Sequence, residues 1–388
     1  MSLLRLFDQR LLHQRMIELQ EPYSLRQDLN EWFLSALSEA LSLPPALAQA
    51  LSRALAHPWT VAEALSVLLV LSAISGLFWL LFWTAAWPRM WAFFWHRWRI
   101  FRLSTIPSVS ERAAAAAIIP DSKFLEIDNL RLHYVQGGEG PDVILLHGIG
   151  ASIYIWRFLF SLLQVHFRVT AFDIPGFGKS SKDSKHNYGL DSQSTALLKA
   201  IDQLGITNPV IVGSSMGGAI ALWMAKLQSE RFKKVFALAP AVDHALLPPR
   251  VKLLATGAPL LRRALNRHTM KLMLTQVLSR RDLVTDATVD AYLEPFLDSG
   301  DSVRAFWNAT SLLSDPRLPG DLKSVNCEVV VIYGERDGMV PYSTMVRLMR
   351  ILPNAKLLTH AHAGHHLMED EPEWLADVLL KELNVNTN

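Results

Sequence analysis

Short apolar runs alternate with helical patterns through the last two thirds of the chain. Six of these runs predict the strands of a mainly parallel sheet: 142–146, 168–172, 210–212, 235–238, 329–333 and 356–359. Two earlier runs, 124–127 and 130–135, predict an opening pair of strands. Strands that alternate with helices are typical of an α/β fold. From 243 to 323 this alternation is interrupted by helical patterns that are apolar and basic.

One segment of the first third has a different pattern. Residues 65–87, LSVLLVLSAISGLFWLLFWTAAW, contain no charged side chain. Because about 20 apolar residues span the hydrocarbon core of a bilayer as a helix, this segment predicts a single transmembrane helix. It lies too far from Met1 to be a cleaved signal peptide, so we expect the mature protein to keep it.

Tryptophans and arginines alternate in the next segment, residues 88–103. Indole rings prefer the headgroup level of a membrane, and arginines there meet lipid phosphates, so this segment predicts an interfacial collar. More arginines lie close to the C-terminal side of the predicted span than to its N-terminal side: Arg89, Arg97, Arg99 and Arg102 against Arg53. This bias predicts that the C-terminal part of the chain faces the cytoplasm.

The other N-terminal segments show no chemistry in their sequence. Residues 1–64 predict a helical tail whose apolar stripe suits packing on the membrane or on a partner subunit. Residues 104–122, which contain Pro107, Pro120 and a run of alanines, predict a linker. The net charge of +2 gives no case for a nucleic-acid partner, and a single cysteine, Cys327, allows no internal disulfide framework. The sequence leaves the oligomeric state open.

Residues 213–217 form a G-x-S-x-G motif directly after the strand-like run 210–212 and before the helix-like run 219–227. A serine on so sharp a turn is lifted clear of both elements, and the flanking glycines permit the strained backbone. Ser215 is therefore the candidate nucleophile. A serine hydroxyl attacks a carbonyl at neutral pH only when an imidazole takes its proton and a third group holds that imidazole.

Candidates for both partners follow later strands. Asp337 lies on the loop after the run 329–333, and His365 lies after Gly364, beyond the run 356–359. The order serine, aspartate, histidine, with each residue at the carboxyl end of a strand, is the order of the α/β-hydrolase fold.

The chain resembles the α/β-hydrolase superfamily over about 123–383 through five ordered motifs. They are L-L-H-G-I-G at 145–150, D-I-P-G-F-G-K-S at 173–180, G-S-S-M-G-G at 213–218, G-E-R-D-G-M-V-P at 334–341, and G-H at 364–365 with E-P-E at 371–373. The resemblance implies an eight-stranded, mainly parallel sheet with helices on both faces. It divides this region into a hydrolase core, 123–242 and 324–388, and a helical cap over the active site, 243–323.

The resemblance also implies roles for individual residues. Ser215 is expected to be the nucleophile, His365 the general base and then the general acid, and Asp337 the group that orients His365. The backbone N–H groups of Met216 and Ile149 are expected to form the oxyanion hole, with Gly148 as the second choice in place of Ile149. No cofactor is expected.

Nearby residues leave alternatives open. His366 is a rival to His365 as base, and Asp243, after the sixth strand, marks where some members of the family keep their acid. His147 is expected to support loop geometry. The histidines at 360, 362, 365 and 366 cluster in the sequence, yet no carboxylate or cysteine lies at ligand spacing in a second element, so no metal site is expected.

The leading hypothesis is a membrane-tethered serine hydrolase that cleaves carboxylic esters, including lipid esters, through an acyl-enzyme. Membrane lipid is the expected partner of the span and of the Trp/Arg segment, and a small-molecule or lipid ester is the expected substrate. Two alternatives stay within the fold: carbon–carbon bond hydrolysis and cofactor-free perhydrolysis. A non-enzymatic membrane scaffold is a third. A serine nucleophile, where an aspartate would be required, argues against a haloalkane dehalogenase or an epoxide hydrolase.

Overall fold

The computed structural model describes residues 119–183, 186–243, 265–297, 300–310 and 312–385. Within these ranges no helix is both long enough and apolar enough to cross a membrane. The predicted membrane span, the Trp/Arg segment and the helical tail all lie outside the described residues, so they remain predictions.

The described chain is built on one sheet of eight strands in the order β1-β2-β4-β3-β5-β6-β7-β8. β1 pairs antiparallel with β2, β2 pairs antiparallel with β4, and every other pairing is parallel. Every predicted run forms a strand, so the prediction of a mainly parallel eight-stranded sheet is confirmed. The strands are β1 Lys123–Ile127, β2 Leu130–Gly137, β3 Asp142–Leu146, β4 Arg168–Phe172, β5 Val210–Ser214, β6 Lys234–Leu238, β7 Val329–Gly334 and β8 Ala355–His360.

Both faces of the sheet are buried, because successive side chains along a strand point to opposite faces and both sets are apolar. In β3, for example, Ile144 and Leu146 join one core cluster, whereas Val143 and Leu145 join the other. The first cluster lies under α8, α9 and α15, and the second lies under α7 and α17. These helices are α7 Arg157–Leu163, α8 Leu190–Gln203, α9 Met216–Leu227, α15 Tyr342–Met349 and α17 Pro372–Glu382. Three short helices complete this part of the fold: η3 Ile153–Trp156, η4 Ser229–Arg231 and α16 Leu367–Asp370.

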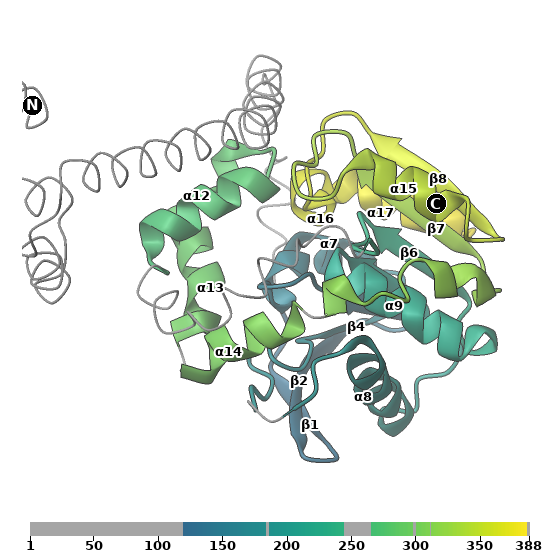
Figure 1. Ribbon diagram of the computed structural model, residues 1–388, viewed down its shortest axis with the longest axis horizontal. Helices are drawn as coiled ribbons and strands as arrows, with labels where there is room; N and C mark the ends of the chain where they lie inside the picture. The colour runs from purple at the N-terminus through teal and green to yellow at the C-terminus, as the bar shows by residue number, and fades with distance from the viewer. Residues whose placement is uncertain (1–118, 184–185, 244–264, 298–299, 311, 386–388) are drawn as a thin grey trace, which may run out of the picture. The chain divides into compact units, whose positions relative to one another are not determined.

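A group of helices, called the insertion below, separates β6 from β7 where the sequence pattern predicts a cap. In Figure 1 its three longer helices are drawn in green and stand together, with α13 packed between α12 and α14. A capping box of Asn266 and Thr269 begins α12. Its described elements are α12 Arg267–Val277, η7 Arg281–Leu283, α13 Asp286–Leu297, α14 Gly300–Ala309, η8 Leu312–Ser314 and η9 Gly320–Ser324. Residues 244–264 lie outside the described ranges, so the predicted domain boundaries stay predictions.

Candidate active site

The candidate residues lie at one edge of the sheet. Ser215 directly follows β5, Asp337 follows β7 and His365 follows β8, and all three strands are parallel. The carboxyl ends of parallel strands therefore bring together side chains that are far apart in the sequence. All three residues are buried.

Ser215 occupies a strained turn between β5 and α9. Its backbone has φ 54° and ψ −114°, a conformation that residues with a Cβ rarely adopt. The neighbouring strand and loop hold this turn: the Ser215 N–H donates to the Leu238 carbonyl at 2.8 Å, and the Ser215 carbonyl accepts from the Ala241 N–H at 3.0 Å. The backbone is thus fixed by its surroundings, as the sequence motif predicts for an exposed nucleophile.

Gly217 permits the close approach of α9 to β3. A Cβ at this position would lie 2.2 Å from the Leu146 carbonyl oxygen, which is far inside contact distance. Only glycine therefore lets the first turn of α9 reach the end of β3. This contact fixes the position of Ser215 relative to the loop that follows β3.

His365 and Asp337 form a direct pair. His365 Nδ1 lies 2.7 Å from Asp337 Oδ2, and Asp337 Oδ1 accepts from the backbone N–H groups of Met339 at 2.7 Å and Val340 at 3.0 Å. A carboxylate only accepts hydrogen bonds, so the His365 proton belongs on Nδ1 and Nε2 keeps a free lone pair. This is the tautomer that a general base needs.

The nucleophile and the base are buried at the same edge, but the structure assigns no hydrogen bond between the Ser215 hydroxyl and the His365 ring among the described residues. Catalytic hydrogen bonds are often long in unliganded enzymes and shorten when substrate binds. The Ser215 side chain lies against Gly148, where a Cβ would sit 3.2 Å from Ser215 Cβ and 3.8 Å from its Oγ. The serine therefore faces the turn after β3.

His147 fixes that turn. The Ile174 N–H donates to His147 Nε2 at 3.0 Å, so the ring proton lies on Nδ1, which donates to the Gly148 carbonyl at 2.7 Å. Burial lowers the pKa of His147, although the nearby Asp173 charge opposes this shift, and the ring is neutral. In a trans peptide the N–H points away from the carbonyl, so the Ile149 N–H is turned away from His147.

Met216 supplies the second predicted donor. It is the first residue of α9, and the first N–H groups of a helix have no acceptor within the helix. The partial positive charge at this helix end also favours a developing anion. Met216 thus offers a backbone N–H at the elbow, and Gly148 and Ile149 each offer one in the turn after β3.

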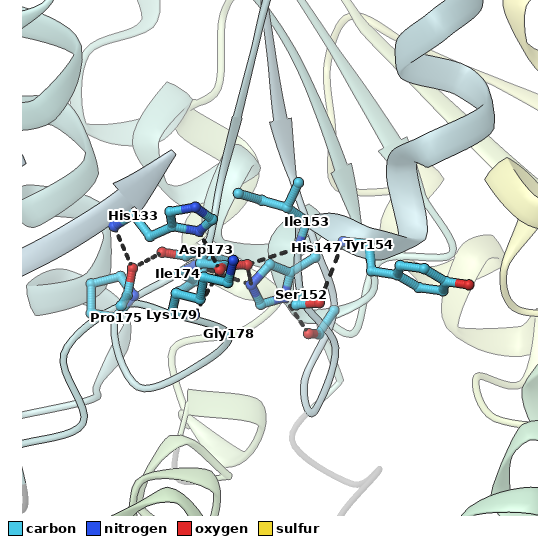
Figure 2. Close-up of polar contacts among 12 residues, drawn as sticks. His133, His147, Ser152, Ile153, Tyr154, Asp173, Ile174, Pro175, Gly178 and Lys179 are labelled. Atoms are coloured by element: carbon cyan, nitrogen blue, oxygen red, sulfur yellow. Dashed lines mark hydrogen bonds and ion pairs between the residues drawn. The ribbon is translucent and has the colours of Figure 1, made fainter. Parts of the chain in front are cut away.

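Asp173 organises the loops behind this turn, as Figure 2 shows. Its carboxylate accepts from the Ile153 N–H at 2.7 Å, from the Lys179 N–H at 2.8 Å and from His133 Nδ1 at 2.6 Å. Burial alone would raise the pKa of Asp173, but the hydrogen bonds from His133 and from the Lys179 N–H help to lower it. Sequence reasoning assigned Asp173 no role, although its place at the head of the D-x-P-G-x-G-x-S motif was a usable signal.

His366, the rival base, has a partner of its own. His366 Nδ1 lies 2.9 Å from Glu369 Oε2 and 3.0 Å from the Tyr292 hydroxyl, and Asp337 is bonded to His365 instead. Asp243, the rival acid, forms an ion pair with Arg347 and lies 3.4 Å from the Thr344 hydroxyl. The contacts of both rivals therefore differ from those of the predicted pair.

The two remaining histidines of the cluster lie away from these contacts. The His360 ring packs against the Trp374 ring in a tilted arrangement with 4.6 Å between centroids, and His362 Nδ1 lies 3.0 Å from the Arg336 guanidinium. Within the described ranges no group of three or more histidine, cysteine or acidic side chains is placed to hold a metal ion.

Comparisons with known proteins show the family of this chain. The family model described as the alpha/beta hydrolase fold matches residues 141–372, which is more than half of the chain. An uncharacterised hydrolase, YugF of Bacillus subtilis, is 27% identical over 267 residues, which cover 67% of this chain and 97% of that protein.

Two further proteins extend the comparison. The 2-hydroxy-6-oxo-6-(2'-aminophenyl)hexa-2,4-dienoic acid hydrolase of Metapseudomonas resinovorans is 28% identical over 293 residues, which cover 73% of this chain and 96% of that protein. The crystal structure of bromoperoxidase from Bacillus anthracis superposes with a TM-score of 0.61 at 22% identity, covering 68% of this chain and all of that one (100%). At this identity the superposition shows the shared fold alone.

Proposed function

Because the chain belongs to the α/β-hydrolase family, we propose that it is a serine hydrolase that cleaves carboxylic esters through an acyl-enzyme. The observation that carries the proposal is the pair formed by His365 Nδ1 and Asp337 Oδ2 at 2.7 Å, at the sheet edge where the strained turn presents Ser215. This pair leaves His365 Nε2 free to accept the serine proton.

The reaction follows from these positions. Ser215 Oγ attacks the ester carbonyl carbon while His365 Nε2 takes the hydroxyl proton, and the Asp337 carboxylate stabilises the imidazolium that forms. The carbon–oxygen bond to the alcohol then breaks, and His365 returns the proton to the departing alkoxide. In the second half, water gives a proton to His365 and attacks the acyl carbon. The bond between this carbon and Ser215 Oγ then breaks, and His365 returns the proton to Oγ as the acid leaves.

Charge develops on the carbonyl oxygen in both halves of the reaction. The N–H groups of Met216 and Ile149 are the donors placed to bind this oxyanion, and each such donor supplies about 3 kcal/mol of transition-state stabilisation. His147 holds the Gly148 carbonyl at 2.7 Å and so fixes the orientation of the peptide that carries the Ile149 N–H. Preorganisation of this kind avoids reorientation of dipoles during the reaction.

An apolar acyl or alcohol group suits the contacts of the insertion, which we propose to act as a cap. A Cβ on Gly150 would lie 3.1 Å from the Phe306 ring and 3.4 Å from the Phe296 ring, so two phenylalanines of the insertion lie against the oxyanion turn. The two rings contact each other edge to face at 5.7 Å. This wall favours hydrophobic esters over small polar ones.

The membrane part of the proposal rests on sequence alone. The uncharged segment 65–87 and the Trp/Arg segment 88–103 would tether the hydrolase to a bilayer, with the hydrolase on the cytoplasmic side. A tether raises the effective concentration of the active site toward substrates dissolved in the bilayer. Lipid esters are therefore the substrate class that we propose first.

A second candidate function is the hydrolysis of a carbon–carbon bond. Several relatives are named as hydrolases of 2-hydroxy-6-oxo dienoates, including one of Pseudomonas putida that is 30% identical over 253 residues. Such substrates carry a carboxylate, which a cation would bind. Two arginines beside the histidine loop are paired with carboxylates, Arg157 with Glu369 and Arg280 with Asp282.

One experiment separates these functions. Full-length protein in detergent, wild type and Ser215→Ala, is assayed with p-nitrophenyl esters of increasing chain length, with monoacylglycerols and with a 2-hydroxy-6-oxohexa-2,4-dienoate. We expect wild type to hydrolyse the longer esters and the monoacylglycerols, and Ser215→Ala to be inactive. Turnover of the dienoate alone would replace the ester proposal, and equal rates for both proteins would remove the enzymatic role of Ser215.

A further inference from the structure

A buried polar cluster joins the insertion to the loop that carries His365. Tyr292 comes from α13, Glu369 from α16, Arg157 from α7, and His366 directly follows His365 in the chain. All four side chains are buried. The mechanism proposed above uses none of them, although they lie next to the base.

The hydrogen bonds of this cluster converge on Glu369. Its Oε1 accepts from the Arg157 guanidinium at 2.5 Å, and its Oε2 accepts from the Tyr292 hydroxyl and from His366 Nδ1, the latter at 2.9 Å. Burial alone would raise the pKa of Glu369, but the Arg157 charge and the bonds from His366 and Tyr292 lower the pKa to about 2. Glu369 is therefore an ionised acceptor that holds both neighbours.

Ring contacts extend the cluster to His365. The His366 ring stacks on the His365 ring with 5.6 Å between centroids and 30° between planes. The Tyr292 ring stacks on His366 with 6.1 Å between centroids and 21° between planes. A displacement of Tyr292 would thus move His366 and remove one wall of the space that holds the His365 imidazole.

Backbone contacts tie the same loop to the end of α12. The Val277 carbonyl accepts from the N–H groups of His365 at 3.0 Å and His366 at 3.2 Å. Asp370 accepts from the N–H of Gly364 at 2.7 Å, and also from the N–H groups of Ser279 and Arg280. The insertion is therefore bonded to the histidine loop and α16 at the end of α12, through the Val277 carbonyl and the Asp370 carboxylate, and at α13, through Tyr292.

Tyr292 shares its helix face with a residue of the apolar wall. Phe296 lies four residues further along α13, and residues four apart in a helix lie on one face. One end of this face contacts the oxyanion turn through Phe296, and the other contacts His366 through Tyr292. A group bound against Phe296 therefore contacts the same helix that is bonded to the histidine loop.

We propose that Tyr292 is a positioning residue that couples α13 of the insertion to the catalytic imidazole of His365, acting through His366 and Glu369. The inference rests on the proposed function, since it gives His365 the role of base. Binding of an apolar group against Phe296 then fixes α13, and α13 fixes His365 for proton transfer. Removal of the coupling affects the chemical step and leaves the apolar binding contacts in place.

The test compares Tyr292→Phe with Tyr188→Phe in the full-length protein. Tyr188 is also buried, and its hydroxyl donates to a backbone carbonyl, that of Asp183, at 2.7 Å. Both variants lose a buried tyrosine hydroxyl, which contacts Glu369 and His366 at Tyr292 and Asp183 at Tyr188, so both are expected to lower the melting temperature. We expect only Tyr292→Phe to lower kcat on a long-chain p-nitrophenyl ester, by roughly tenfold, with KM changed less than about twofold.

A second pair of variants keeps the test decisive if Tyr292→Phe does not fold. In His366→Asn the amide nitrogen takes the place of Nδ1 toward Glu369, whereas His366→Ala leaves no donor there. We expect His366→Asn to retain most of kcat and His366→Ala to lose roughly tenfold. Equal kcat in these two variants would overturn the coupling.

The outcomes distinguish this inference from the proposed function. If wild type hydrolyses the ester and Tyr292→Phe keeps the kcat of Tyr188→Phe, the coupling is wrong and the hydrolase proposal stands. If Tyr292→Phe raises KM and leaves kcat unchanged, Tyr292 shapes the binding site and does not position His365. If wild type hydrolyses no ester, the proposed function itself is wrong.

Discussion

The rings of His365 and His366 are stacked 5.6 Å apart, yet each binds a different carboxylate. His365 Nδ1 pairs with Asp337 on the loop after β7, whereas His366 Nδ1 pairs with Glu369, which follows it by three residues in the chain. Two adjacent imidazoles are thus held by different carboxylates. The bond to Asp337 links the loops that follow β7 and β8. The bond to Glu369 links the histidine loop to Arg157 in the core and to Tyr292 in the insertion.

Asp337→Asn is expected to lower kcat by about 10³- to 10⁴-fold and to leave KM within a few fold of wild type. An asparagine presents an amide N–H to His365 and so favours the tautomer with its proton on Nε2, which cannot accept the serine proton. Steady-state kinetics on a p-nitrophenyl ester measure the effect.

Asp243→Asn is the matched control for that variant, because Asp243 is also a buried aspartate at the carboxyl end of a strand. Its carboxylate is paired with Arg347, so the change is expected to lower the melting temperature and to leave kcat near the wild-type value. A loss of kcat in Asp243→Asn as large as that in Asp337→Asn would contradict the assignment of the acid.

Gly148→Ala is expected to slow acylation at least tenfold. The new methyl group would lie 3.2 Å from Ser215 Cβ and 3.8 Å from Oγ, in the space where the substrate carbonyl must sit. Gly320→Ala is the control, since a Cβ there meets no heavy atom within 4 Å. Acylation rates of the two variants with one activated ester provide the comparison, and equal rates would place the substrate elsewhere.

Phe306→Ala is expected to change chain-length preference. Loss of the ring that lies against Gly150 removes apolar contact area, so kcat/KM should fall about tenfold or more for long acyl chains and change little for acetate. Leu272→Ala, at an exposed position of α12, serves as the control. An equal fall in kcat/KM for all acyl-chain lengths would indicate a structural effect and would contradict a role of Phe306 in chain-length specificity.

Glu369→Gln is expected to remove a pH-dependent part of the stability. The folded-state pKa of about 2 lies below the ordinary value of 4.5, so this group stabilises the fold in full above pH 4.5 and loses that contribution as the pH falls toward 2. The contribution is at most about 3 kcal/mol. Urea unfolding at several pH values should show a constant difference from wild type above pH 5 that shrinks below pH 4.5. A difference that is unchanged between pH 6 and pH 3.5 would contradict this prediction.

The sequence predicts the central strands of the sheet well because both of their faces are buried. Strands such as β3, β5 and β7 are then largely apolar runs bounded by turns, and such runs are visible without a structure. The placement of Ser215, Asp337 and His365 at one edge was predictable for a related reason: each lies at or shortly after the carboxyl end of a parallel strand, so the sheet determines which edge they share.

The cluster around Glu369 could not be predicted in the same way. Tyr292 and Arg157 lie 77 and 212 residues before Glu369 in the sequence, and neither belongs to a motif. Their meeting depends on how α13 and α7 pack around α16, which hydrophobic periodicity does not encode. The histidine run gave a signal in the sequence, but only the contacts show that His365 and His366 have separate partners.

The central claim is that Ser215 is an activated nucleophile, and active-site labelling tests it most directly. Full-length wild type, Ser215→Ala and the neighbouring variant Ser214→Ala are treated with a fluorophosphonate probe, and the modified peptide is identified by mass spectrometry. The account predicts stoichiometric modification at Ser215 in wild type and Ser214→Ala, and no modification in Ser215→Ala. Folded wild-type protein that stays unmodified, or modification that persists in Ser215→Ala, would contradict it.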